Sequence, residues 1–422
     1  MIDKQPSCDD PVQVGLMPVD EARARLQSRL RPIAKIESVT CRDSLGRVLA
    51  EPVVSPINVP GQTNSAMDGY AIHSGSIPQN GTAMLNLLGT AWAGQPYTPP
   101  VALGEAVRIF TGAIMPDGTD TVVIQEHVEA TAEAVTIDSD VVACKNVRQA
   151  GEDIKLGEQA LSPGVQIGAA EAGLIASLGI NEVRVYAPPT VAFFTTGDEL
   201  RTLDDHAGES LAPGLLFDSN RYTLMGMLSK LGVTTIDLGV VPDSEAATRK
   251  VLLEASKSAD VIVSSGGVSA GDADYVSRVF QNLGDVAFWK IAMRPGRPLA
   301  VGNMGDALFF GLPGNPVAVM VTFLEFVQPA IKTLMGIHDV TPVQFPAECR
   351  SSLRKTQGRV EYQRGIFSRD ADGKLVVIST GKQGAGRLSS MCLANCMIVL
   401  APEMAKVEPG DCVDIQPFYG LM

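Results

Sequence analysis

Between residues 186 and 335, apolar strand-like runs alternate with helix-like stretches. The runs read VAFFTT, VTTIDLGV, DVIVSS, DVAFWKIA, PLAVG and ALFFGL, and the stretches include 219–231, 244–257 and 274–283, before a long helix from Pro316. Strands that alternate with helices favour a mainly parallel sheet with helices on both faces. We therefore expect a central α/β domain that binds its ligands beyond the carboxyl ends of the strands.

The flanking sequence predicts three further parts. Residues 54–154 hold short apolar runs broken by Gly and Pro, which indicate an inserted β domain. Residues 18–53 and 155–185 each contain one helix-like stretch, and we expect these two segments to pack together as one helical domain. Residues 336–422 return to strand-like runs and predict a small C-terminal β domain. A chain of 422 residues is long enough for such a multidomain α/β protein.

Charge and composition exclude several classes of function. The chain carries 34 Lys and Arg against 47 Asp and Glu, a net charge of −13, so we expect neither nucleic-acid nor membrane binding. The longest apolar run, Val317 to Val327, is interrupted by Glu325 and is too short for a membrane span of about 20 residues. Scattered cysteines without a CxxC pair, and an N-terminus unlike a leader, favour a reducing, cytoplasmic location.

Acidic side chains follow the predicted strands at one edge of the sheet. Glu199 follows the first run and Asp243 the second, while Asp272 and Asp274 follow DVIVSS. Several carboxylates at one edge repel each other unless a cation joins them, and Mg²⁺ prefers oxygen ligands. An Asp at the start of a helix is also a common N-cap, so neither Asp272 nor Asp274 alone decides between the two interpretations.

Two turns at the same edge suit an anionic or phosphorylated ligand. Glycines let the backbone approach a ligand closely, hydroxyls offer hydrogen bonds, and a helix that begins with Pro leaves N–H groups free for an anion. A tight turn without a ligand is the alternative for the second of them. The residues concerned are Gly266, Gly267 and Ser269 in the first turn, and Pro313, Gly314 and Asn315 in the second.

A cationic loop lies between these two turns. Lys290, Arg294 and Arg297 fall within eight residues in FWKIAMRPGRP. The guanidinium group offers a fork of donors that matches an oxyanion or phosphate. The alternative is a solvated basic loop without a ligand.

Seven motifs, in their order along the chain, point to one family. Together they resemble the molybdopterin molybdenumtransferase family of the bacterial MoeA type, which is similar to the E domain of gephyrin. The motifs are NSAMDGYA (64–71), FTGAIMP (110–116), GEDI (151–154), TTGDEL (195–200), SSGGVSAGDADY (264–275), FWKIAMRPGRP (288–298) and GLPGNPVA (311–318).

The resemblance implies an elongated homodimer of four domains, with the helical segments in the dimer contact. It implies that adenylylated molybdopterin and molybdate yield molybdenum cofactor and AMP with Mg²⁺, although Zn²⁺ is also discussed for the family. It also implies an active site between the α/β domain of one subunit and the inserted β domain of the other.

The same resemblance implies roles for individual residues. The metal and the nucleotide fall to Glu199, Asp243 and Asp274, and the partner's side of the cleft falls to Asp68, Thr111 and Asp153. Molybdate and the phosphates fall to Lys290, Arg294 and Arg297. Further substrate contacts fall to Gly266, Gly267, Ser269, Pro313, Gly314, Asn315 and Arg364.

Three residues depart from the family pattern. Many relatives have Lys where this chain has Arg294 and Arg297, which keeps the charge but replaces a point charge with a planar fork. Relatives often have Ser where Ala385 follows Gln383 and Gly384, so one hydroxyl is lost.

Other functions remain open at this point. A molybdopterin adenylyltransferase resembles residues 186–335, but it usually carries Gly-Gly-Thr-Gly where this chain has Gly-Gly-Val-Ser at 266–269, and it stands alone as a domain. A non-catalytic, gephyrin-like scaffold is the second alternative. The sequence decides neither between molybdate and tungstate nor whether another cofactor-synthesis protein docks to the chain.

Overall fold

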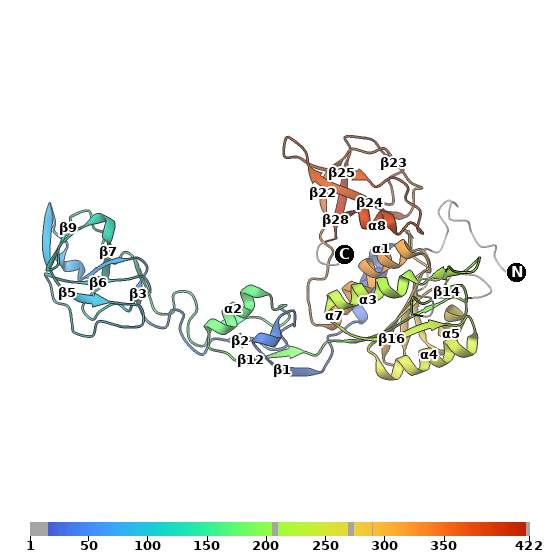
Figure 1. The fold of residues 1–422 in the computed structure, drawn as a ribbon, viewed down its shortest axis with the longest axis horizontal. Helices are drawn as coiled ribbons and strands as arrows, with labels where there is room; N and C mark the ends of the chain where they lie inside the picture. Colours follow the sequence, from blue (N-terminus) through green and yellow to red (C-terminus); the bar gives the residue numbers. More distant parts are fainter. Residues whose placement is uncertain (1–15, 205–209, 269–273, 289, 419–422) are drawn as a thin grey trace. The chain divides into compact units, whose positions relative to one another are not determined.

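The computed structural model describes residues 16–204, 210–268, 274–288 and 290–418. The chain divides into two units (Figure 1). Of the described residues, unit 1 contains 16–38, 46–50 and 184–418, and unit 2 contains 39–45 and 51–183.

The centre of unit 1 is a six-stranded sheet in the order β16-β13-β17-β21-β20-β18. The first four strands in this order run parallel, and at one edge β20 pairs antiparallel with both β21 and β18. A two-residue turn at Gly305 and Asp306 joins β20 to β21, and such a short connection forces an antiparallel pair. The strands are β13 (Thr190–Thr196), β16 (Thr234–Val241), β17 (Val261–Ser265), β18 (Asp285–Phe288), β20 (Ala300–Met304) and β21 (Ala307–Leu312).

Helices cover both faces of this sheet (Figure 1). Val191 and Phe193 of β13 join one core with α3 and the helix from Pro316, whereas Ala192 and Phe194 join a second core with α4 and α5. This period of two is that of a strand buried on both sides. The helices are α3 (Ser219–Leu231), α4 (Glu245–Ser258), α5 (Tyr275–Leu283), α6 (Pro316–Thr322), a π-helical segment (Phe323–Val327) and α7 (Gln328–Leu334).

The helix limits agree with the predicted 219–231, 244–257 and 274–283 to within one residue. Local capping explains the agreement. The side chains of Asp218 and Ser244 accept hydrogen bonds from backbone N–H groups in the first turns of α3 and α4. Gly232, at φ +71°, ends α3 in the left-handed conformation.

The C-terminal part of unit 1 is a small β-barrel. Its five strands pair in the order β24-β25-β22-β28-β26, and β26 pairs with β24 again to close the barrel. The two-residue strand β19 (Met293–Arg294) adds to β24 in parallel. The barrel elements are β22 (Phe345–Cys349), β23 (Leu353–Arg354), β24 (Val360–Arg369), β25 (Leu375–Ser379), α8 (Ser389–Leu393), β26 (Cys396–Leu400), β27 (Lys406–Val407) and β28 (Cys412–Pro417).

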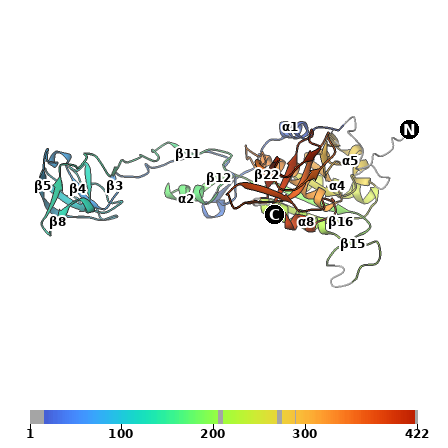
Figure 2. The ribbon, with the colours of Figure 1, turned by 90° about the horizontal axis from the view of Figure 1, so that it is seen from above.

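Unit 2 contains a second six-stranded sheet, in the order β7-β4-β6-β5-β9-β8 (Figure 2). Two buried clusters of apolar side chains pack on it. The strands are β4 (Gly69–Ile72), β5 (Thr82–Ala91), β6 (Glu105–Ile109), β7 (Thr121–Ile124), β8 (Glu129–Ala130) and β9 (Ala134–Asp138). Smaller elements are η1 (Arg42–Ser44), β2 (Val53–Val54), β3 (Asn64–Ser65), η2 (Ser74–Ser76), η3 (Gln125–His127), β10 (Val147–Arg148), β11 (Gln159–Leu161) and α2 (Ala169–Ser177).

The first helix packs differently from our expectation. Val19, Ala22 and Leu26 of α1 (Val19–Arg29) are buried in the first core of unit 1, whereas α2 belongs to unit 2. The apolar face of α1 is where the spacing predicts it, but spacing does not identify the surface that covers it. The four predicted domain limits stay a prediction. The remaining short strands are β1 (Ile36–Thr40), which pairs with β12 (Glu182–Tyr186), and β14 (Leu200–Arg201), which pairs with β15 (Leu216–Phe217).

The stretch Pro316–Leu334 is continuously helical over 19 residues, and by length and composition alone it passes as a membrane span. The expectation that this part of the chain is too short for a membrane span is therefore wrong by length and composition. The helix is 83% buried inside the protein. A core helix also meets the length and composition criterion, and burial in the first core explains why this one is apolar.

We expect the thiol of Cys396 to be protected by the barrel. Its side chain is buried, and burial raises the pKa of the thiol to about 12. Because the thiolate is the reactive form, a maleimide at about pH 8 should leave Cys396 unmodified in the folded protein and should label the exposed Cys412. Timed labelling read by peptide mass spectrometry measures this, and equal labelling of both thiols would contradict the closed barrel.

Candidate functional site

The predicted acidic turns meet at the carboxyl ends of β13 and β16. The hydroxyl of Thr196 donates a hydrogen bond of 2.5 Å to the carboxylate of Asp243. The backbone N–H of Asp243 donates to the carboxylate of Asp198 at 3.1 Å. The connections reverse direction between β13 and β17, and this is the place where open α/β sheets bind ligands.

The glycines after β17 make a close approach to β13. Gly266 and Gly267 have φ angles of +95° and +66°. A Cβ at Gly266 would lie 2.7 Å from the carbonyl oxygen of Thr196, and one at Gly267 would lie 2.7 Å from Val276. Only glycine fits this turn, so the backbone itself forms the surface there.

The third predicted metal ligand, Asp274, stands at the N-cap position of α5, but its side chain makes no capping hydrogen bond. The capping interpretation therefore does not account for Asp274. Among the described residues, no group of three or more His, Cys, Asp or Glu side chains is close enough to hold a metal ion. Ser269 and Asp272 lie outside the described residues.

Asn220, which the sequence does not single out, ties two of the turns together. Its amide nitrogen donates to the hydroxyl of Ser265 at 3.0 Å and to the carbonyl of Gly314 at 2.7 Å. The hydroxyl of Ser265 donates in turn to the carbonyl of Pro313 at 3.2 Å. The DSN sequence at the start of α3 is a recognisable helix cap, but nothing in it indicates this bridge.

A cavity of about 670 Å³ opens beside these turns, and we call it the basic pocket. Four separate segments of unit 1 line it: 293–298 from the cationic loop, 313–318 from the start of α6, 359–364 from β24 and the residues before it, and 383–385. Of the predicted substrate residues, the pocket brings together Arg294, Arg297, Pro313, Gly314, Asn315 and Arg364. Lys290 is exposed and is not among the lining residues.

Four arginines and one glutamate give the pocket its charge. Arg359 and Glu361 join the predicted arginines, and both are buried. A guanidinium nitrogen of Arg294 lies 3.8 Å from the carboxylate of Glu361. The excess of cations fits an anion, because each guanidinium presents several donors in one plane.

Arg364 is buried and firmly held. Its guanidinium donates to the hydroxyl of Ser390 at 3.0 Å and to the carbonyls of Gln383 and Gly384 at 3.2 and 3.0 Å. Burial lowers the pKa of Arg364 to about 10, so the side chain stays protonated at neutral pH. The same segment contains Ala385, whose carbonyl accepts from the N–H of Val317 at 3.0 Å. The missing hydroxyl at 385 therefore falls in the basic pocket.

Arg359 and Glu361 are the pocket residues that sequence reasoning missed. Glu361 is the first residue of the run EYQRG that contains Arg364, and Arg359 lies two residues before it, so RVEYQR carried a signal of clustered charge at the start of one strand. Successive side chains of a strand point to opposite faces of the sheet. For this reason, the run alone does not show which of its charged side chains line the same cavity.

Unit 2 holds the other predicted group. The backbone N–H and the hydroxyl of Thr111 both donate to the carboxylate of Asp68 at 2.8 Å. These bonds lower the pKa of Asp68. Asp153 lies instead in a surface hollow of about 550 Å³, lined also by Val59, Pro60, Arg148 and Glu152.

Known families and structures match this chain along nearly its whole length. The family models that match are the MoeA N-terminal region (domain I and II) over residues 17–179, the probable molybdopterin binding domain over 192–333, and the MoeA C-terminal region (domain IV) over 346–418. A molybdopterin molybdenumtransferase from Haemophilus influenzae is 39% identical over 409 residues, covering 96% of this chain and 100% of that protein.

The chain belongs to the molybdopterin molybdenumtransferase family. A second relative of that name, from Nostoc, is 40% identical over 364 residues and covers 84% of this chain and 82% of its own length. The crystal structure of a molybdopterin biosynthesis MoeA protein from Pyrococcus horikoshii matches with a TM-score of 0.82 at 27% identity, covering 95% and 100% of the two chains. The predicted family, the multidomain α/β fold class and the assignment as a transferase are confirmed.

We expect the substitution Thr111→Val to raise the pKa of Asp68 part of the way to its ordinary value. The variant loses the hydroxyl donor and keeps the backbone donor. In the parent, the folded-state pKa is lowered, so the stability from this contact is present at neutral pH and is lost as pH falls through that pKa. Carboxyl NMR titration of Asp68 measures the shift, and an unchanged titration curve would contradict the role of the hydroxyl.

Proposed function

We propose that this protein inserts molybdate into adenylylated molybdopterin and releases AMP in a Mg²⁺-dependent step. The basic pocket is the observation that carries the proposal. It combines four arginines with the turn at 313–315, which suits an anionic ligand. This turn lies against the glycine turn after β17, since a Cβ at Gly314 would lie 3.8 Å from the Cα of Gly266.

The arginines suit the electrostatic problem of this reaction. Molybdate is a tetrahedral dianion, and it must approach a dithiolene that is also anionic. Fixed cations lower that repulsion and cost no reorganisation when the reaction occurs. Arg364, held by two carbonyls and a hydroxyl, is a preorganised donor of this kind.

The acidic turns suit the nucleotide side of the reaction. Their carboxylate and hydroxyl oxygens are ligands that Mg²⁺ prefers, whereas Zn²⁺ more often takes Cys and His. Mg²⁺ commonly binds through one or two carboxylates together with substrate phosphates and water, so Asp243, Glu199 and Asp274 need not form a complete ligand set by themselves. When bound, Mg²⁺ polarises the phosphoanhydride for cleavage.

We further propose a homodimer in which the active site uses unit 1 of one subunit and unit 2 of the other. The family resemblance motivates this arrangement. It also explains why Asp68 and Thr111 form a functional-looking pair in a β domain far along the chain from the basic pocket. Docking of other cofactor-synthesis proteins and a cytoplasmic location stay predictions.

A direct assay tests the function. The protein is mixed with adenylylated molybdopterin, Mg²⁺ and molybdate, and both AMP release and activation of an apo-molybdoenzyme are measured. Molybdate-dependent AMP release with active cofactor supports the proposal, and tungstate is titrated next. Adenylylation of molybdopterin by ATP would support the adenylyltransferase alternative, and binding without turnover would support a scaffold.

We expect Asp243→Ala and Asp274→Ala to lower Mg²⁺-dependent AMP release by at least about tenfold without unfolding the chain, because each variant removes a proposed metal or phosphate contact. Asp237→Ala is a matched control, since its carboxylate pairs with Arg221 on the surface of unit 1. Full activity of either test variant would exclude the metal role of that residue.

We expect two inactive variants to complement each other in a mixed dimer. Asp68→Ala removes a group of unit 2 and Asp274→Ala a group of unit 1. In a heterodimer of the two, one of the two sites has both groups intact, so random mixing should restore about a quarter of the wild-type rate. Subunits are exchanged and AMP release is measured. No recovery despite proven exchange would contradict a shared site, as would an active monomer.

A further inference from the structure

Glu325 is a buried carboxylate that the proposed reaction does not use. It lies in the π-helical segment between α6 and α7, and only 1% of the residue is exposed. Every neighbour of Glu325 along this helix, from Val317 to Ile331, is buried too. A charged group in such a place needs partners, and π-helical segments are frequent at functional sites.

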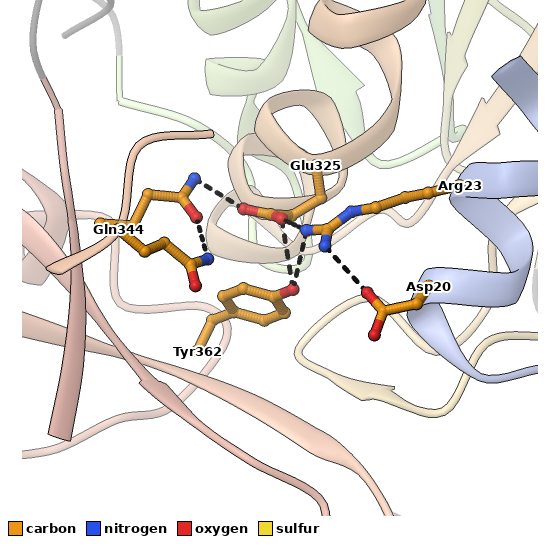
Figure 3. Close-up of polar contacts among 6 residues, drawn as sticks. Asp20, Arg23, Glu325, Gln344 and Tyr362 are labelled. Carbon is orange, nitrogen blue, oxygen red and sulfur yellow. Dashed lines mark hydrogen bonds and ion pairs between the residues drawn. The ribbon is translucent and has the colours of Figure 1, made fainter. Parts of the chain in front are cut away.

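The partners of Glu325 come from three parts of unit 1 (Figure 3). The guanidinium of Arg23 on α1 forms an ion pair with it. The hydroxyl of Tyr362 on β24 donates to it at 3.2 Å, and the amide of Gln416 on β28 donates at 2.8 Å. Arg23 also donates to the Tyr362 hydroxyl at 3.3 Å. The carboxylate therefore joins α1, the long helix and the barrel.

Two of these connections lead to the basic pocket. Tyr362 lines the pocket, although its hydroxyl is engaged with Glu325. It lies on the strand segment that also places Arg364 and Glu361 in the pocket. The long helix that contains Glu325 also contributes Ala318 to the wall of the pocket, seven residues before Glu325.

We propose that Glu325 is a positioning residue for the basic pocket. Its hydrogen bond with Tyr362 fixes the ring that forms part of the wall, and it thereby sets the distance between the long helix and Arg364 of β24. This inference rests on the proposed role of the pocket in binding molybdate.

Two double variants separate this role from simple stability. Arg23→Met with Glu325→Gln, and Arg23→Met with Glu325→Leu, both remove the buried ion pair, and such removal is often tolerated. Only the Gln version keeps an acceptor for the Tyr362 hydroxyl. We expect the Gln version to bind molybdate within about twofold of the parent, and the Leu version about tenfold more weakly, as loss of one buried hydrogen bond implies.

Calorimetric titration of the full-length protein with molybdate measures these affinities without the pterin substrate. In turnover, the KM for molybdate should rise by the same factor, with a smaller change in kcat. Tyr362→Phe keeps the ring, loses only the hydroxyl and should also weaken binding about tenfold. If the Leu version does not fold, the molybdate affinity of Tyr362→Phe tests the role of the hydrogen bond instead.

Two further variants serve as controls. Arg47→Met breaks a partly buried ion pair with Glu37 that does not line the pocket, so it should lower stability and leave molybdate affinity unchanged. Arg364→Met should weaken binding strongly, which assigns the measured heat to the basic pocket.

If the Leu version and Tyr362→Phe both bind molybdate as tightly as the parent, the positioning role of Glu325 is wrong, while the proposed role of the pocket stands. The same holds if the Gln and Leu versions lose molybdate affinity equally. Absence of molybdate binding by the parent, or binding unaffected by Arg364→Met, would instead overturn the proposed role of the pocket and this inference with it.

Discussion

The parallel pairing of β19 with β24 is the contact on which the rest of the site depends. Met293 and Arg294 pair with Val360 and Glu361, and this brings the cationic loop of the α/β domain against the barrel. Arg294 and Arg297 lie in a loop of the α/β domain, and Arg364 lies on a strand of the barrel. Without this pairing they would not line one pocket. A contact of two residues per strand is weak by itself. The closed barrel and the long helix hold it by fixing the two backbones that it joins.

Like charges in one cavity repel each other, and the structure offsets this repulsion in two ways. Glu361 provides one carboxylate among four arginines. Backbone carbonyls of Gln383 and Gly384 accept from Arg364, so part of its charge is already satisfied. The remaining positive potential is local, because the whole chain carries a net charge of −13. A small dianion, such as the molybdate proposed above, would relieve the repulsion among the arginines, whereas the net negative charge of the chain disfavours a large polyanion.

Features that depend on neighbouring residues could be predicted from the sequence. The limits of α3 follow from Asp218 and Gly232, and the strands of the α/β sheet follow from apolar runs between turns. The glycine turn at 266–267 and the cationic loop were recognisable for the same reason. Features that depend on distant pairing could not be predicted. The partner of α1, the closure of the barrel by β24 and β26, and the bridge from Asn220 to Gly314 each join segments far apart in the chain.

The long helix shows how one element serves both packing and the site. Its first turn supplies Ala318 to the basic pocket, and its apolar length fills the first core of unit 1. Packing alone does not require a carboxylate at the centre of such a helix. The carboxylate is instead matched by Arg23, Tyr362 and Gln416, which come from three other elements. Buried polar groups of this kind constrain how elements meet more than they add stability. Here the constraint falls on the strand that contains Arg364, a buried arginine that lines the basic pocket.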